Sequence, residues 1–141
     1  MAEIIILEDD EDLGPLMKQS LAKAGHKVRL YVKGSDAVEG FEILPADIVI
    51  ADIIIREDGK PVADGGLAVI MKLKYKAREK NHRVKFIAIS GKYVNRGMEG
   101  ILQSAQSLGA DTILKKPFLP EELLFKIEML LDHARPVRHF S

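Results

Sequence analysis

Short apolar runs rich in isoleucine and valine recur along this chain, and a longer segment of helical periodicity separates each run from the next. This alternation is typical of repeated strand–helix units, which place their strands in one parallel sheet. We therefore expect an α/β fold. The strands are expected near Glu3–Leu7, Lys27–Val32, Ile48–Ala51, Lys85–Ile89 and Thr112–Lys115.

The intervals between the strands are expected to form helices, because capping residues and helix stops lie at their ends. Ser35 should cap the second helix, which should stop before Pro45. The other helices are expected from Asp10–Asp12 to Ala24–Gly25, over Leu67–Lys80, over Gly97–Leu108 and from Pro120 to about Ala134.

One connection, from Ile53 to Gly66, is unusually long. It has about fourteen residues, where connections of this kind usually have about 2 to 6. We interpret it as an insertion and expect a solvated loop. Because it directly follows the third strand, it should lie at the edge of any site formed there and modulate access to that site.

The expected strands end in residues that can carry chemistry. In a parallel sheet all the carboxyl ends of the strands lie at one edge, and ligand sites form in the crevice there. Acidic residues follow the first and third strands, a hydroxyl the fourth and an amine the fifth. These residues are Glu8, Asp9, Asp52, Ser90, Gly91, Lys115, Lys116 and Pro117.

This set of side chains favours a metal site combined with a covalent phosphoryl site. Clustered carboxylates repel one another unless a cation lies among them, and oxygen ligands suit a hard metal ion, for which magnesium is the best candidate. A lysine ammonium and a serine hydroxyl could each donate a hydrogen bond to a phosphoryl group carried by Asp52. An aspartyl phosphate is a known covalent intermediate.

In this order and at strand ends, these residues resemble the receiver domain of two-component response regulators, from Glu3 to about His133. The resemblance implies a flavodoxin-like, doubly wound, five-stranded parallel sheet in the order 2-1-3-4-5, with helices on both faces. It also implies that a sensor histidine kinase or histidine phosphotransfer domain donates a phosphoryl group to Asp52. Such a domain is a switch read by a downstream protein effector; it hydrolyses its phosphoryl group slowly and is not an enzyme.

The metal ligands expected for Mg²⁺ are carboxylates and one backbone group. Asp9 and Asp52 should bind the metal directly, with Glu8 second or acting through water. The resemblance adds the backbone carbonyl of Ile54. The acidic run could instead only cap the following helix, an alternative that fits Asp10 and Asp12 better than Asp9.

The resemblance assigns the remaining roles. It implies a cis peptide bond between Lys116 and Pro117, so that Lys116 faces the phosphoryl group, while alternation along the strand directs Lys115 away. Ser90 is the expected switch hydroxyl, although it could be an ordinary turn serine. Gly91 should leave room for the imidazole of the donor.

Three features depart from the family pattern. Arg56 replaces a usual proline, and the usual Asp-Gly pair occurs twice, as Asp58-Gly59 and Asp64-Gly65, which the insertion explains. Ile113 stands where an aromatic residue usually reports phosphorylation, so the switch should run without an aromatic rotor. No output domain is expected beyond a receiver domain at residues 1–134 and a tail at 135–141.

Composition excludes several classes of protein. The chain has 141 residues, enough for one domain, and its 21 lysines and arginines balance 21 aspartates and glutamates, so no overall field attracts nucleic acid or an anionic membrane. There are no cysteines and no apolar run long enough for a membrane helix. We expect a cytoplasmic protein with neither nucleic-acid nor membrane partners.

Two other functions remain open at this point. The chain could be a degenerate receiver that binds partners without phosphorylation. It could also be a magnesium-dependent phosphatase with Asp52 as nucleophile, but such enzymes usually have an aspartate two residues later, where this chain has Ile54. Whether the domain stands alone or belongs to a hybrid kinase also remains open.

Overall fold

A computed structural model of the chain describes residues 1–53, 55–57, 60–62, 65–91 and 109–134. The helix expected over Gly97–Leu108, the carbonyl of Ile54 and the tail at 135–141 therefore lie outside the described residues. Within them, no helix is long and apolar enough to cross a membrane.

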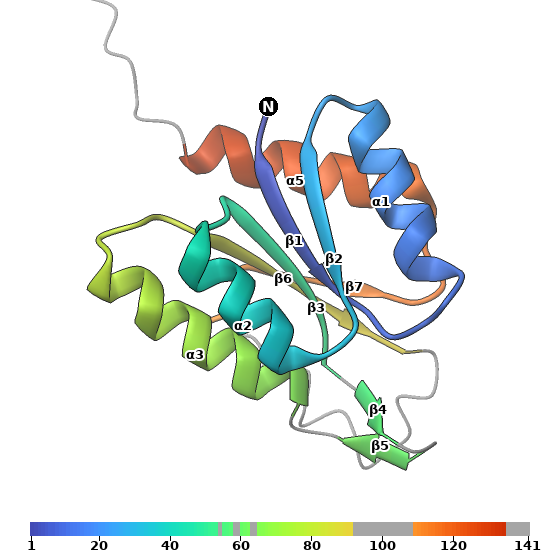
Figure 1. Ribbon diagram of the computed structural model, residues 1–141. Helices are drawn as coiled ribbons and strands as arrows, with labels where there is room; N and C mark the ends of the chain where they lie inside the picture. The colour runs from blue at the N-terminus through green and yellow to red at the C-terminus, as the bar shows by residue number, and fades with distance from the viewer. Residues whose placement is uncertain (54, 58–59, 63–64, 92–108, 135–141) are drawn as a thin grey trace, which may run out of the picture.

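A five-stranded parallel sheet forms the centre of the molecule (Figure 1). Its order is β2-β1-β3-β6-β7, which is the expected order 2-1-3-4-5 when only the strands of this sheet are counted. This prediction is confirmed. The strands are β1 (Glu3–Leu7), β2 (Lys27–Tyr31), β3 (Ile48–Asp52), β6 (Lys85–Ser90) and β7 (Thr112–Lys115).

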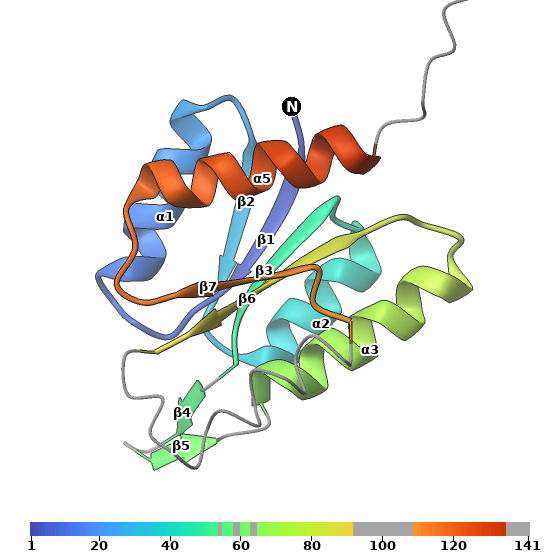
Figure 2. The same cartoon turned by 180° about the vertical axis from the view of Figure 1, so that it is seen from behind.

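Helices cover both faces of this sheet, as Figures 1 and 2 show. Side chains alternate along β1: Ile5 and Leu7 pack into a core with α2 and α3, whereas Ile4 and Ile6 pack into a second core with α1 and α5. Because both of their faces are buried, the three central strands of the sheet read as nearly continuous apolar runs, whereas the two edge strands are less buried and include charged residues. The helices are α1 (Leu13–Lys23), α2 (Gly34–Ile43), α3 (Gly65–Glu79) and α5 (Pro120–Ala134).

The start of α2 corrects one prediction. The residue before the helix is Lys33, which is extended at φ −107° and ψ 140°, and Ser35 lies inside the first turn. The helix begins earlier because the Lys33 carbonyl already accepts a hydrogen bond from the Ala37 amide at 3.2 Å. Glycine at position 34 also allows close packing, since a Cβ there would lie 2.7 Å from Val69 Cγ2.

The insertion corrects a second prediction. Part of it forms an antiparallel hairpin of β4 (Ile55–Glu57) and β5 (Lys60–Val62), with Ile55 opposite Val62. Strands of three residues are too short to show alternation in a sequence, which is why a loop was expected. The Asp58-Gly59 pair between them is a sequence that favours tight hairpin turns. In both views the hairpin projects from the end of the molecule where β3 and β6 finish.

Arg29 on β2 provides a test of how the sheet holds α2. Its guanidinium donates to the carbonyls of Gly40 at 2.9 Å and Leu44 at 2.7 Å, which satisfies the end of the helix. Arg29→Met should therefore lower the free energy of unfolding in urea by about 1 to 3 kcal/mol. Lys27→Met, on the same strand but exposed, should cost less than about 0.5 kcal/mol. Equal losses would mean that the guanidinium does not stabilise α2.

Candidate functional site

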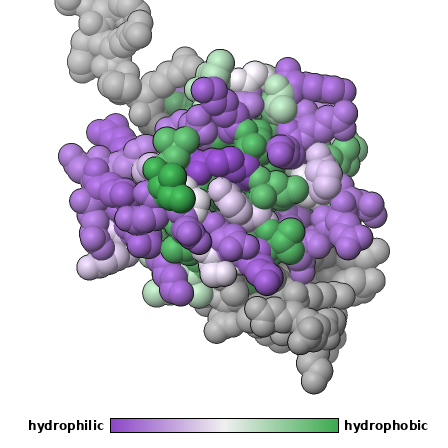
Figure 3. All heavy atoms as spheres, in the orientation of Figure 1, coloured by the Kyte–Doolittle hydropathy of each residue, from purple (hydrophilic) through white to green (hydrophobic). Residues whose placement is uncertain are grey.

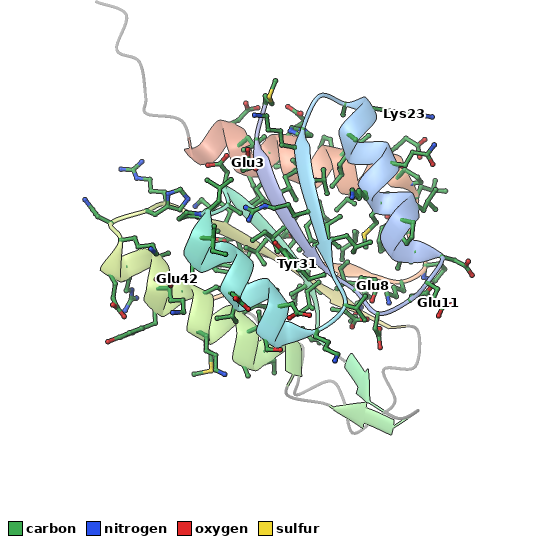
Figure 4. All side chains as sticks on the ribbon, viewed as in Figure 1. Glu3, Glu8, Glu11, Lys23, Tyr31 and Glu42 are labelled. Carbon is green, nitrogen blue, oxygen red and sulfur yellow. The ribbon has the colours of Figure 1, made fainter. Side chains whose placement is uncertain are left out.

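The carboxyl edge of the sheet brings the expected polar residues together. Asp52 is the last residue of β3, Ser90 is the last residue of β6, and Glu8 follows β1, where Figure 4 shows it. All three are buried, with exposed fractions of 4%, 0% and 1%. Buried charges are costly unless they are paired, so their partners determine what this edge can do.

Lys116 is the partner of two of these carboxylates. Its Nζ lies 2.9 Å from Asp52 Oδ2 and forms a second ion pair with Glu8 Oε1. The peptide bond between Lys116 and Pro117 is cis. The neighbouring Lys115 is exposed, so of the two successive lysines only Lys116 enters the site.

Two carboxylates sharing one ammonium group leave an excess negative charge. Burial, together with the hydrogen bond and the negative charge of Asp52, raises the pKa of Glu8 to about 8, although the hydrogen bond and the charge of Lys116 act in the opposite direction. Burial alone would lower the pKa of Lys116, but its hydrogen bond to Glu8 and the charges of Asp52 and Glu8 raise it. At neutral pH the metal-free site therefore holds a proton on Glu8 and a charged lysine.

The same edge offers oxygen ligands for a cation. One carboxylate oxygen from each of Glu8, Asp9 and Asp52 lies within 4.8 Å of the others. The Asp9 amide donates to Glu8 Oε2 at 3.1 Å, which orients that carboxylate. Three acidic oxygen donors suit a hard divalent cation, so the residues present fit a magnesium ion.

Ser90 and Gly91 follow on the neighbouring strand. The Ser90 hydroxyl has no hydrogen-bond partner among the residues that the structure describes, although it is fully buried. The Ser90 carbonyl accepts from the Lys116 amide at 2.8 Å, which links the ends of β6 and β7. Among the described residues, no atom would lie within 4 Å of a Cβ at Gly91, so this part of the chain leaves space open there. Ile113 packs against the core on the side of α2 and α3.

Gly66 is a residue of this site that sequence reasoning missed. It lies in the first turn of α3, and a Cβ there would lie 2.0 Å from the Asp52 carbonyl oxygen and 2.6 Å from Ile53 Cα. The absence of a side chain thus allows α3 to begin directly against the backbone of Asp52. The signal available in the sequence was the pair Gly65-Gly66 inside a helix, where glycine is unfavourable without a packing reason.

Comparison with known proteins assigns the family. The sequence model of one protein family, the response regulator receiver domain, matches residues 4–128 of this chain. The chain belongs to this family. It is therefore a receiver domain of two-component signal transduction, which confirms the resemblance seen in the sequence.

The curated relatives of this receiver domain are response regulators of greater length. The transcriptional regulatory protein RprY of Bacteroides fragilis is 31% identical over 132 residues, which are 94% of this chain and 50% of that protein. Response regulator SaeR of Staphylococcus aureus is 26% identical over 99% of this chain and 54% of that protein. The chain spans about half the length of these relatives.

Solved structures show the same fold. The chemotaxis protein CheY4 of Vibrio cholerae superposes with a TM-score of 0.76 at 19% identity, over 92% of this chain and 98% of that chain. The receiver domain of the Francisella response regulator 1452 gives a TM-score of 0.71 at 19% identity, over 96% and 100% of the two chains. The flavodoxin-like architecture expected from the sequence is thus confirmed.

The raised pKa of Glu8 predicts how stability depends on pH. Without metal, the free energy of unfolding should fall as pH rises from about 4.5 to about 8, because the unfolded chain releases the Glu8 proton in this range and the folded protein retains it. One proton limits the slope to about 1.4 kcal/mol per pH unit. Urea unfolding in the presence of a chelator measures it. Glu8→Gln should flatten the slope, and the exposed Glu11→Gln should not; an unchanged slope in Glu8→Gln would contradict the assignment.

The contact at Gly66 predicts a sensitive position outside the charged cluster. Gly66→Ala should lower the free energy of unfolding by about 1 to 3 kcal/mol, because the new Cβ must displace backbone. It should also shift the amide NMR signals of Asp52 and Ile53. Gly91→Ala is the matched control, because its Cβ would enter open space, and should cost less than about 0.5 kcal/mol. If both variants behaved alike, the contact would not constrain the site.

Proposed function

We propose that Asp52 accepts a phosphoryl group from a phosphohistidine on a sensor histidine kinase or a histidine phosphotransfer protein, with Mg²⁺ bound beside it. The supporting observation is the Lys116 ammonium, which pairs with both Asp52 and Glu8. These two carboxylates converge with that of Asp9.

The metal would be held by Asp9, Asp52 and Glu8, with the carbonyl of Ile54 as the further ligand implied by the family. When bound, magnesium neutralises the charge of the incoming phosphoryl group. Binding would also favour loss of the Glu8 proton, because carboxylate ligands must be deprotonated. The negative charge that appears when Glu8 loses this proton is thus balanced by the divalent cation.

In the transfer step, a carboxylate oxygen of Asp52 attacks phosphorus. The bond between phosphorus and the donor's imidazole nitrogen breaks, and its electron pair stays on that nitrogen. Lys116 donates a hydrogen bond to a phosphoryl oxygen, and the open space at Gly91 admits the imidazole ring. The protein contributes mainly positioning and charge neutralisation around a loose transition state. Hydrolysis of the aspartyl phosphate is slow.

Ser90 is the proposed switch. Its buried hydroxyl lacks a partner among the described residues, so a phosphoryl group on Asp52 offers it one. A hydrogen bond to a charged group contributes about 1.5 to 3 kcal/mol, enough to shift a conformational equilibrium about tenfold to a hundredfold if it forms in one state only. Because Ile113 already packs in the core and carries no ring, the signal runs without an aromatic rotor. The phosphorylated state is read by a downstream protein effector.

Phosphorylation can be tested directly. Incubation with a small phosphodonor and Mg²⁺, followed by intact-mass spectrometry, should show one labile phosphoryl group, and tandem spectrometry should locate it on Asp52. Asp52→Asn should abolish the adduct, as should a chelator. Asp12→Asn, an exposed residue that makes no side-chain cap, is the control and should label normally. The absence of any adduct would favour a degenerate receiver, and rapid multiple turnover would favour a phosphatase.

The two adjacent lysines allow a test of whether Lys116 carries the conformational response to the phosphoryl group. Lys116→Ala should reduce the change in the amide NMR signals of Ser90 and Gly91 when a phosphoryl mimic binds, because the ammonium that links β7 to Asp52 is lost. Lys115→Ala removes the same charge from an exposed position and should leave the response intact. Equal responses in wild type and Lys116→Ala would exclude this lysine from the switch.

A further inference from the structure

A second concave site lies at the end of α3 and the start of β6, the opposite end of the sheet from Asp52. It is a cavity of about 310 Å³. Four basic side chains line it: Lys74 and Arg78 from α3, Arg83 from the segment before β6, and Lys85 from the start of β6. We call this cavity the basic pocket. In Figure 3, hydrophilic side chains gather over this side of the molecule.

These positive charges are largely uncompensated. Among the described residues, Lys74, Arg78 and Arg83 form no ion pair, and Lys85 lies 3.9 Å from Asp111 Oδ1. That carboxylate is already engaged, because Asp111 Oδ2 accepts a hydrogen bond from the Phe86 amide at 2.7 Å. The pocket therefore carries an excess of positive charge within the described part of the chain.

The other basic residues of α3 provide an internal comparison. Lys76 and Lys80 pair with Glu42 of α2, at 2.9 and 3.4 Å, and Glu42 is labelled in Figure 4. This row of lysines on α3 thus shares one carboxylate of the neighbouring helix, which compensates part of its positive charge. Stabilisation of the helix C-terminus explains a cation on α3 itself, but it does not explain Arg83 and Lys85, which come from a different segment and line the same cavity.

The other residues that line the basic pocket are Ala77, His82 and Val84. Ala77 is buried and Val84 is half-buried, and together they give the pocket an apolar surface. The His82 ring also lines it. Its Nε2 lies 2.8 Å from the Ala46 carbonyl, to which it donates, and its ring packs edge-on against Phe41 with centroids 6.1 Å apart. These contacts fix one wall in place.

We propose that the basic pocket binds a small molecule that carries linked phosphate groups, as nucleoside di- and triphosphates and inorganic oligophosphates do. Converging lysines and arginines suit several phosphate oxygens, and arginine can bind them with two parallel hydrogen bonds. The volume is at the lower end of the range for small-molecule sites. The half-buried side chain of Val84 gives a nucleoside an apolar surface on which to pack. This site is separate from the proposed function at Asp52.

Isothermal titration of the whole chain in the presence of a chelator tests the proposal, with inorganic tripolyphosphate, ATP and orthophosphate as probes. Tripolyphosphate and ATP should bind saturably with Kd below about 1 mM, and orthophosphate should bind at least about tenfold more weakly. Tighter binding of ATP than of tripolyphosphate would identify the nucleoside as part of the ligand. Equal affinity would identify the phosphates alone.

Charge-matched variants locate the site. Arg78→Gln with Arg83→Gln should weaken tripolyphosphate binding at least about tenfold, because two charged hydrogen-bond donors are lost. Lys76→Gln with Lys80→Gln removes the same charge from the paired row and should change the affinity less than about twofold. Lys116→Ala should bind tripolyphosphate with unchanged affinity. A failure of the proposed phosphorylation of Asp52 can therefore be distinguished from a failure of binding at the basic pocket. NMR amide shifts should fall within Lys74–Lys85, and each variant's thermal melt checks its fold.

Three results would overturn the proposal. They are the absence of saturable binding by any probe, equal losses in the two double variants, and tighter binding of a nucleic-acid oligomer or an acidic peptide than of ATP. The last would make the surface a macromolecular contact.

Discussion

The ammonium of Lys116 is the group on which the carboxyl edge of this molecule depends. It lies between Glu8 and Asp52, and so joins the ends of β1, β3 and β7, which are far apart in the sequence. Burying a carboxylate without a partner costs several kcal/mol, and two nearly inaccessible carboxylates lie here side by side. One ammonium cannot neutralise both, so the metal-free site retains a proton on Glu8.

This imbalance connects stability with the proposed function. A fully neutralised cluster would have little affinity for a further cation, whereas a cluster that must hold a proton can exchange it for a metal ion. A buried group whose charge is balanced only by a bound ligand also lowers the free energy of unfolding of the ligand-free protein. Ligand binding restores part of this stability. The electrostatic cost at Glu8 and the Ser90 hydroxyl, which has no partner among the described residues, are therefore the features expected where selection acts on binding rather than on stability.

The sequence was sufficient for the sheet and for the grouping of the site, for a physical reason. Strands buried on both faces are apolar throughout, and in a parallel sheet their polar ends must meet, so Asp52, Ser90 and Lys116 could be placed together without coordinates. The hairpin at Ile55–Val62 was not predictable in this way, because its strands are three residues long. The contact of Gly66 with the Asp52 backbone was missed because it depends on how α3 approaches β3, which no local pattern encodes.

Net charge illustrates the same limit at larger scale. The balance of 21 basic and 21 acidic residues predicts no overall attraction to a polyanion. That balance is a sum over the whole chain, but the fold places acidic and basic side chains at opposite ends of the strands. Acidic side chains gather where β1 and β3 end, and basic side chains line the pocket where β6 begins. At physiological ionic strength, exposed charges such as those of Arg78 and Arg83 in the basic pocket are screened beyond about 8 Å. The two ends of a five-residue strand are farther apart than this, since each residue advances the chain by about 3.3 Å. Each end therefore presents its own local field, and a neutral protein can bind a cation at one edge of its sheet and an anion at the other.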